Sequence, residues 1–300
     1  MRRAVDIFGR VLIGLGVVLL LFTAYQIWGT SIQEAHTQST LRNTLVQETN
    51  NAKIRQALSD AATLAKLPSG PPIPAAATVA PPEGQPVGDI RIPVIGVNQV
   101  VVQGTNTPDL RKGPGHYIGT PLPGQGGNAA VAGHRTTYGH PFYNLDAVKV
   151  GDPIVVTTPQ GIFVYDITKS WVVSPSDTSV VRNAYANLIT LTTCNPRFSA
   201  STRLIVRGQL AHSQLYPNTL PVATVHADPQ SNDLAGDNSV RLTDTLFWGF
   251  LIVVVGGTVL YLAHRFRPRR WPIWITGALA MLVFLWFFFG AVSPLLPASY

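Results

Sequence analysis

Three long, uncharged apolar runs stand out in the pattern of hydrophobic and polar positions. They begin at Val11 (VLIGLGVVLLLFTAYQIW), at Leu246 (LFWGFLIVVVGGTVLYLA) and at Trp271 (WPIWITGALAMLVFLWFFFG). A helix needs roughly 20 mainly apolar residues to cross a bilayer, and each run approaches or reaches that length. The pattern predicts three transmembrane helices. The first is expected to be an uncleaved anchor, because no small-residue cleavage site follows it closely.

Basic residues flank these apolar runs. Arg2, Arg3 and Arg10 lie at the start of the chain, and the segment HRFRPRR joins the second run to the third. Short loops rich in Lys and Arg stay in the cytoplasm. We therefore expect the N-terminus and the HRFRPRR loop inside the cell, and the long stretch between the first two runs outside.

The stretch between the first two apolar runs contains many short strand-like segments. The strand-like segments are DIRIPVIGV, NQVVVQG, NAAVAGH, DPIVVTTP, GIFVYDITKSWVV, NLITLTTC and RLIVRGQLA. The turn-forming residues Gly, Pro, Asn and Asp separate these segments. Such closely spaced strands are typical of a mainly β domain, either a small closed barrel or a sandwich. Short helices are expected at TPDLRKG and PFYNLDAV.

Composition and pattern divide the chain into five parts. The parts are an N-terminal cytoplasmic end with the first transmembrane helix (1–30), a helical juxtamembrane stalk and Pro/Ala linker (31–86), the extracellular strand-rich domain (87–211), a polar tether (212–244), and two transmembrane helices with a short basic cytoplasmic loop (245–300).

The stalk and the linker differ in their patterns. The stalk carries apolar residues at loosely helical spacing, namely Leu41, Leu45, Ile54 and Leu58. The linker, PSGPPIPAAATVAPPEGQP, has no packing pattern, and we expect it to be an extended spacer.

The overall composition fits a membrane protein. Hydrophobic residues make up 46% of the chain and charged residues 12%, which is more apolar than an average soluble protein. The net charge of +7 is compatible with binding nucleic acid. Because the basic residues cluster beside the apolar runs, we instead expect contact with the membrane and no nucleic-acid partner.

Cys194 is the only cysteine in the chain. A single cysteine excludes an internal disulfide framework and leaves an inert buried thiol, an intermolecular bridge or a reactive nucleophile. Side chains alternate along the strand NLITLTTC, so Ile189, Leu191 and Thr193 share a face that we interpret as core. Cys194 ends the other, more polar face, where a groove can form.

The segment NPRFSAST separates Cys194 from Arg203. If the two flanking strands form an antiparallel hairpin, these residues become near neighbours. Arg207 shares the face of Arg203 but lies about 13 Å further along the strand. We therefore choose Arg203 as the cation beside the thiol, with Arg207 as the alternative. A nearby cation lowers the pKa of a thiol and favours the nucleophilic thiolate.

Acyl transfer through a thioester also needs a proton shuttle, which an arginine cannot provide. Of the 7 histidines, those in the strand-rich region are His116, His134 and His140. His134 ends the apolar strand NAAVAGH, as Cys194 ends its own strand. We therefore expect His134 to be the acid/base, with His140 and His116 as alternatives.

The segments AGHRTTYGHPFYNLDAVKVGD and LTTCNPRFSASTRLIVRG together resemble the sortases, which are membrane-anchored cysteine transpeptidases of Gram-positive bacteria. The resemblance runs from Val87 to about Leu210. It implies an eight-stranded β-barrel with short helices. It also implies that His134 is the general acid/base, Cys194 the nucleophile, and Arg203 a hydrogen-bond donor to the substrate or oxyanion.

Within that family, GHRTTYGHPFYNL looks most like class E. A tyrosine at the position of Tyr138 is linked there to a preference for the signal L-A-x-T-G over L-P-x-T-G. Two C-terminal membrane passes are unusual for class E, and class C pilin polymerases often carry a C-terminal pass. Because VAPPEGQPVGD lacks the Asp-Pro-aromatic lid motif of class C, the anchoring role is favoured and a pilin polymerase is the alternative.

The resemblance implies a membrane-anchored enzyme that cleaves a LAXTG/LPXTG-like signal between Thr and Gly through a Cys thioacyl intermediate. Its partners would be secreted proteins with that C-terminal signal, a lipid-linked peptidoglycan precursor that supplies the acceptor amine, and the membrane. No cofactor or metal is expected. Tyr138, Thr137 and Thr193 are expected to contact the substrate.

Other protein classes fit the sequence less well. An L,D-transpeptidase would carry an S-H-G-x-x-R motif around its cysteine, and this motif is absent. A papain-like protease has its cysteine before its histidine, whereas His134 precedes Cys194 here. A non-catalytic membrane scaffold remains the alternative from another class, and it predicts that Cys194→Ala leaves surface proteins anchored normally.

Overall fold

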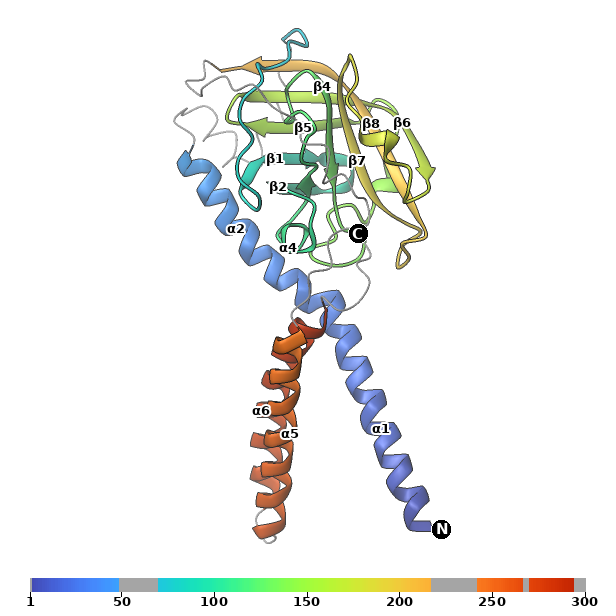
Figure 1. Cartoon of the computed structure of the whole chain (residues 1–300), viewed down its shortest axis with the longest axis vertical. Helices are drawn as coiled ribbons and strands as arrows, with labels where there is room; N and C mark the ends of the chain where they lie inside the picture. The colour runs from blue at the N-terminus through green and yellow to red at the C-terminus, as the bar shows by residue number, and fades with distance from the viewer. Residues whose placement is uncertain (1, 49–69, 217–241, 267–269, 294–300) are drawn as a thin grey trace. The chain divides into compact units, whose positions relative to one another are not determined.

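The computed structural model describes residues 2–48, 70–216, 242–266 and 270–293 (Figure 1). The chain forms two compact units. One contains the strands together with the helix that follows Gly29, and the other consists of long apolar helices.

Eight strands form a closed barrel in which hydrogen-bonded neighbours follow the order β1-β2-β3-β4-β7-β8-β6-β5. Every strand has a hydrogen-bonded neighbour on each side, although the short β3 pairs with only two residues of β2 and two of β4. The predicted eight-stranded barrel is therefore confirmed. The strands are β1 (Pro86–Ile92), β2 (Val97–Gln103), β3 (Gly115–His116), β4 (Gly127–Ala132), β5 (Pro153–Thr158), β6 (Gly161–Val173), β7 (Asn187–Asn195) and β8 (Thr202–Leu215).

The barrel interior is filled by alternate side chains of these strands. Ile189 and Leu191 of β7 are fully buried there, as the strand pattern predicted. Other fully buried members of this core are Ile90, Val131, Ile154, Phe163, Tyr165 and Val206. Burying one such side chain contributes about 1.5–3 kcal/mol to folding, so this core is a main source of stability.

Short helical segments connect the strands. The two segments expected to be helical contain α4 (Thr107–Leu110) and the 3-10 turn η4 (Leu145–Ala147). Asn106 caps α4, since its side-chain oxygen accepts a hydrogen bond from the backbone N–H of Asp109 at 2.9 Å. Two further 3-10 turns are η3 (Pro93–Ile95) and η5 (Thr178–Val181).

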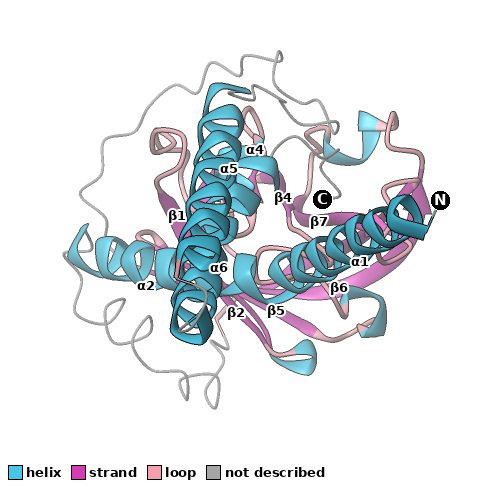
Figure 2. Cartoon of the chain, turned by 90° about the horizontal axis from the view of Figure 1, so that it is seen from below, coloured by secondary structure: helices cyan, strands magenta, loops and turns pink. Residues whose placement is uncertain are grey.

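Helix α2 (Thr30–Glu48) lies on the barrel beside β1 and β2 (Figure 2). Leu41 and Leu45 are buried against Val100 and Val102 of β2. These two leucines belong to the apolar pattern expected along the stalk, whereas its other two positions lie outside the described residues. The helix is therefore packed on the barrel along part of its length.

The described part of the Pro/Ala segment is extended but packed, which differs from the expected simple spacer. The backbone N–H of Ala75 donates to the carbonyl of Gly124 at 2.7 Å. The amides of Gln125 and Gln160 donate to the Thr78 hydroxyl at 3.1 Å and the Ala76 carbonyl at 2.7 Å. Composition alone does not reveal these contacts, because the glutamines come from distant parts of the sequence.

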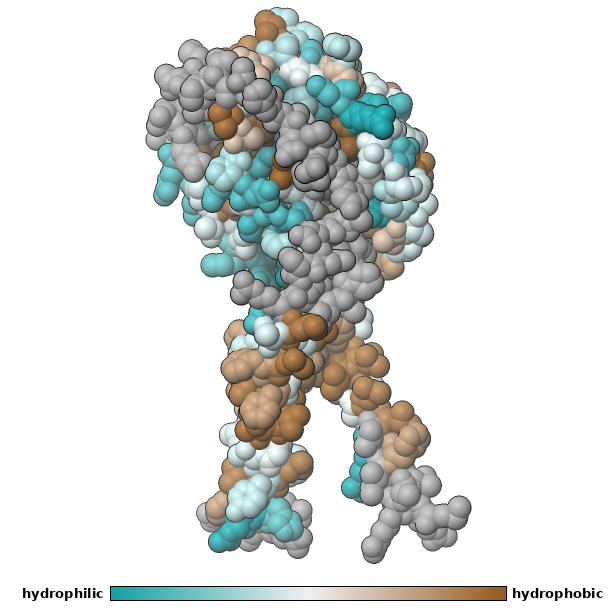
Figure 3. Space-filling model, in the orientation of Figure 1, coloured by the Kyte–Doolittle hydropathy of each residue, from teal (hydrophilic) through white to brown (hydrophobic). Residues whose placement is uncertain are grey.

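The second unit contains α1 (Arg2–Ala24), the π-helical segment η1 (Tyr25–Gly29) except for its last residue, α5 (Leu242–Arg265) and α6 (Arg270–Val292). The described chain has three helical stretches long and apolar enough to cross a membrane. On the face drawn in Figure 3, apolar side chains predominate along the described parts of α1, α5 and α6, with polar ones near the lower ends of these helices. Trp248 of α5 stacks on Phe287 of α6 with ring centroids 4.8 Å apart, which helps to pair these two helices.

Candidate active site

The predicted site residues lie where β4, β7 and β8 run side by side. Strand β7 pairs antiparallel with β8, and Cys194 lies directly opposite Arg203 in this pairing. Directly opposed residues of two paired strands project from the same face. The predicted hairpin is therefore present, and it brings the thiol and the guanidinium of these residues to one face of the sheet.

His134 reaches the same place from the neighbouring strand. Strand β4 pairs parallel with β7, with Ala132 level with Thr192. The register continues past the end of β4, because the N–H of Gly133 donates to the Thr192 carbonyl at 3.0 Å. Two residues further along each strand are His134 and Cys194, so the imidazole and the thiol come from adjacent positions.

The surroundings of Cys194 are more apolar than the strand pattern predicted. Only 2% of the residue is exposed. Thr190 and Thr192, which made this face look polar, direct their hydroxyls to Asn128 at 2.7 Å and Tyr117 at 3.0 Å. The thiol packs in a cluster on the outer face of the barrel with Leu110, Tyr117, Ala130, Ala132, Val180, Val181 and Ile205.

The charge state of the thiol reflects two opposed effects. Burial raises the pKa of Cys194 to about 11, although the positive charges of Arg203 and Arg135 lower it in part. The thiol is therefore protonated near neutral pH. A nucleophilic role requires a nearby base to take its proton.

Two arginines lie on this face, and their hydrogen bonds differ. Arg203, opposite the thiol, donates from Nη1 to the carbonyls of Ala200 at 3.0 Å and Thr202 at 3.2 Å. Arg207 donates to the Thr190 hydroxyl at 3.1 Å and to the Val180 carbonyl at 2.7 Å. Arg203 therefore lies beside the thiol, whereas Arg207 links η5 to the barrel through its bond to Val180.

The histidines considered as alternatives lie in different surroundings. His116 is fully buried, and its ring nitrogens bond to Gln103 and to the Pro121 carbonyl, both at 2.9 Å. Burial lowers the pKa of His116 to about 4, so its ring stays neutral. His140 is exposed and packs its ring edge-on against Tyr143. Neither histidine is on a strand end beside Cys194.

Of the three residues expected to contact the substrate, Thr137 and Tyr138 lie beside His134, whereas Thr193 does not. The hydroxyl of Thr137 lies 3.3 Å from Nδ1 of His134. The ring of Tyr138 lies against the imidazole with centroids 5.0 Å apart. Thr193 projects to the opposite face from Cys194, and its hydroxyl donates to the Gly133 carbonyl at 2.7 Å. The first two contacts restrain the imidazole, and the third holds β7 against the end of β4.

Arg135 is a component of the site that the sequence analysis missed. Its Nη1 donates to the carbonyl of Cys194 at 3.0 Å and to the side-chain oxygen of Asn195 at 2.9 Å. Its Nη2 pairs with Asp146 at 3.0 Å, and Asp146 also pairs with Arg197 at 2.7 Å. The one sequence signal for this role is that Arg135 directly follows His134.

The arrangement suits nucleophilic acyl transfer. It combines a thiol, an imidazole from the adjacent strand end and a guanidinium across the hairpin, which are the groups that such chemistry needs. Within the described ranges, no group of three or more His, Cys, Asp or Glu side chains is arranged to hold a metal ion.

Comparison with known proteins identifies relatives of this chain. The family model of the sortase domain matches residues 90–211. Sortase SrtE1 of Streptomyces coelicolor is 32% identical over 233 residues, covering 72% of this chain and 60% of that protein. The chain therefore spans less than two thirds of the length of SrtE1.

Two further relatives are matched over most of their length. Sortase D of Bacillus subtilis is 34% identical over 173 residues, covering 53% of this chain and 85% of that protein. Among solved structures, sortase E from Streptomyces avermitilis has 38% identity and a TM-score of 0.42, covering 45% of this chain and 93% of that one.

Proposed function

The chain belongs to the sortase family of cysteine transpeptidases, and we propose that it is a membrane-anchored sortase with Cys194 as its nucleophile. One observation carries the proposal. Cys194 lies opposite Arg203 on β8, and the register of β4 and β7 brings His134 level with it. The end of β4, the end of β7 and the start of β8 are thus neighbours, which supports a site built from the imidazole, the thiol and the guanidinium.

In the first step, the sulfur of Cys194 attacks the carbonyl carbon of the Thr–Gly bond in the sorting signal. His134 takes the thiol proton, which is needed because burial raises the pKa of Cys194 to about 11. Since Nδ1 of His134 faces Thr137, we assign this transfer to Nε2. Arg203 donates hydrogen bonds to the oxyanion that develops.

The tetrahedral intermediate then collapses. The C–N bond breaks, His134 gives its proton to the leaving glycine amine, and the threonine acyl group remains on Cys194 as a thioester. In the second step an acceptor amine attacks the thioester carbon. A new C–N bond forms and the C–S bond breaks. His134 accepts the proton from the attacking amine and passes it to the released Cys194 thiolate, which restores the starting state of the site.

We further propose that the signal is of the LAXTG/LPXTG type and that the acceptor is an amine of a lipid-linked cell-wall precursor. The match to SrtE1 and the sequence around Tyr138 support a class E enzyme with an anchoring role. The contact of Tyr138 with the His134 ring supports a position for this tyrosine close to the reacting bond.

The proposed location follows from charge. With Arg2, Arg3 and Arg10 at the cytoplasmic end of the first span, the barrel would lie outside the cell. Substrate and acceptor both reside at the membrane, so anchoring the barrel there raises their effective concentration.

A transfer assay tests the proposal. The full chain in detergent micelles is incubated with an L-A-x-T-G peptide, with and without triglycine. We expect the fragment ending in Thr to become joined to triglycine, and Cys194→Ala to give no product. A product distribution that ignores the added amine would make the protein a hydrolase. Peptide cleavage that survives Cys194→Ala would contradict the assigned nucleophile.

A further inference from the structure

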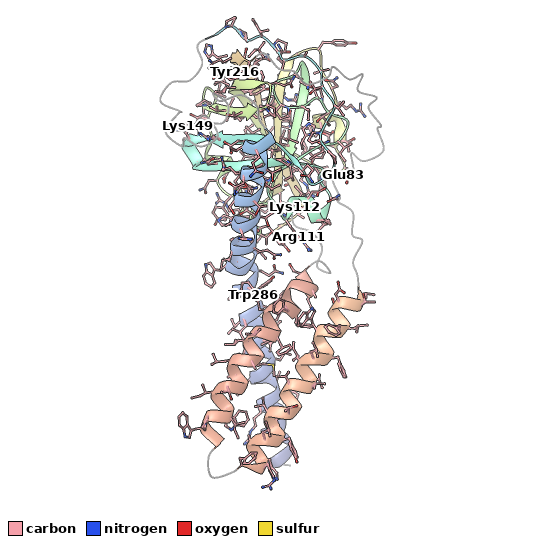
Figure 4. The ribbon with its side chains drawn as sticks, turned by 90° about the vertical axis from the view of Figure 1, so that its left-hand side faces the viewer. Glu83, Arg111, Lys112, Lys149, Tyr216 and Trp286 are labelled. Atoms are coloured by element: carbon pink, nitrogen blue, oxygen red, sulfur yellow. The ribbon has the colours of Figure 1, made fainter. Side chains whose placement is uncertain are left out.

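Helix α2 is fixed to the barrel by polar contacts as well as by its leucines. Gln38 donates to the carbonyls of Val100 at 3.0 Å and Lys112 at 2.7 Å, and its side-chain oxygen accepts from the N–H of Val100 at 2.7 Å. Arg42 pairs with the buried Asp89 at 2.6 Å. Figure 4 shows Lys112 on the side of the barrel beside the helix. A flexible spacer would not form these specific bonds, so α2 is a packed part of the barrel unit.

The first turns of α2 contact the loop that follows His134. The hydroxyl of Thr30 accepts a hydrogen bond from the N–H of Tyr138 at 3.2 Å, and Thr30 is fully buried. The carboxylate of Glu34, also buried, lies directly against Gly139. Gly139 has a φ of +70°, and a Cβ at this position would collide with that carboxylate. The loop backbone and the helix are therefore closely fitted.

Tyr138 has a backbone conformation that depends on its surroundings. Its φ is 48°, in the left-handed region that residues other than glycine seldom occupy. Such conformations persist where neighbouring contacts hold them. The Tyr138 ring contacts the imidazole of His134, with centroids 5.0 Å apart, and the guanidinium carbon of Arg111 lies 5.5 Å from the centroid of the Tyr138 ring. A shift of the Tyr138 backbone would therefore change the position of the His134 imidazole.

From these contacts we propose that α2 is part of the catalytic unit and that Thr30 is a positioning residue for His134. Thr30 holds the backbone of Tyr138 through its hydrogen bond, and Glu34 packs against the next residue, Gly139. The Tyr138 ring, held in this way, restrains the imidazole of His134. This inference rests on the proposed function of His134 as acid/base. A small misplacement of a proton-transfer group lowers the rate of the chemical step, so the effect belongs in kcat.

The test uses the full chain in detergent micelles and three substitutions. Thr30→Val keeps the shape of the side chain and removes the acceptor oxygen, whereas Thr30→Ser keeps the oxygen. Thr40→Val is the matched control, because Thr40 is an exposed threonine on the same helix. For each variant we measure kcat and KM with the sorting peptide, the melting temperature, and hydrogen exchange at the Tyr138 amide.

We expect Thr30→Val to lower kcat about threefold to tenfold, the effect of losing one hydrogen bond, with KM changed less than about twofold. Exchange at the Tyr138 amide should become faster. Thr30→Ser should restore kcat, and Thr40→Val should match the wild type in every measurement.

Several results would overturn the inference. These are an unchanged kcat in Thr30→Val, a loss that Thr30→Ser does not restore, or an equal loss in Thr40→Val. A wild-type chain that cleaves no sorting peptide would refute the proposed function and with it the catalytic part of this inference. In that case the exchange rate at Tyr138 still decides whether Thr30 holds the loop.

Discussion

Cys194 is buried and has two arginines nearby, and these two properties act on its pKa in opposite directions. Burial dominates and raises the pKa to about 11. Arg203 and Arg135 lower it only in part, so the thiol carries its proton at neutral pH. In the proposed mechanism, His134 removes that proton when the substrate is in place.

The pH dependence of alkylation follows from this pKa. Iodoacetamide reacts with the thiolate, so its rate with Cys194 should rise about tenfold per pH unit up to a midpoint near pH 11. Arg203→Ala removes a cation that lowers the pKa and should move the midpoint to higher pH. Steric shielding slows the reaction equally at every pH and leaves the midpoint in place. A midpoint at or below pH 8.5 in the wild type would contradict this account.

The choice between the two arginines gives a second prediction. Arg203→Ala should lower kcat about 10²- to 10³-fold, the usual effect of removing an oxyanion donor. Arg207→Ala should cost less, since Arg207 bonds to Thr190 and to the Val180 carbonyl. Steady-state kinetics with one sorting peptide compares them directly. A larger loss in Arg207→Ala would reverse the assignment.

Residue positions in the site were predictable where they depended on local pattern. Strand alternation identified the buried face of β7, and hairpin pairing brought Arg203 opposite Cys194. The apolar surroundings of the thiol were not predictable, because Leu110 and Val180 come from separate connections between strands. The role of Arg135 depends on Asp146 and Asn195, whose proximity only the fold creates.

At the scale of elements, Arg135 connects the end of β4 to β7 and to η4. It bonds to the carbonyl of Cys194, to Asn195 and to Asp146, and is itself 2% exposed. Removal of the guanidinium would leave the buried Cys194 carbonyl without this donor, which costs about 1–3 kcal/mol, and would also remove the bonds to the partly exposed Asn195 and Asp146. The strand ends that carry His134 and Cys194 would then be held less firmly together.

We therefore expect Arg135→Ala to lower both the melting temperature and kcat. The drop in melting temperature should be several degrees for a loss of about 2 kcal/mol. Arg197→Ala is the matched control, because Arg197 also pairs with Asp146 but is partly exposed, and such pairs contribute little. Equal effects of the two substitutions on thermal unfolding and on kcat would show that Arg135 has no special role.

Most strands were predictable as elements, because alternation and turn residues are local signals. The packing of other segments against the barrel was not predictable from local signals. Helix α2 carries few apolar residues, and its fit to the barrel relies on Gln38, Thr30 and Arg42, whose partners lie far away in the sequence. The same holds for the Pro/Ala segment, whose Ala76 and Thr78 bond to distant glutamines.

If the protein has the proposed orientation, the barrel and the HRFRPRR loop lie on opposite sides of the membrane. A single cysteine is introduced at Thr40 or at Arg265 in the Cys194→Ala chain, which has no other thiol. Its labelling then shows on which side of the membrane that position lies. Both positions are exposed in their own units. On intact cells a membrane-impermeant maleimide should label Thr40→Cys, and should label Arg265→Cys only after permeabilisation. The reverse labelling would refute the proposed orientation.

The most direct test of the central claim is the mass of the full chain after incubation with L-A-x-T-G and L-P-x-T-G peptides in the absence of an amine. We predict an added mass equal to the peptide up to its threonine, located by fragmentation on Cys194 and removed by hydroxylamine. The adduct should be more abundant with L-A-x-T-G, and absent in Cys194→Ala. An unmodified Cys194 in a folded chain exposed to both peptides, or an adduct on another residue, would contradict the account.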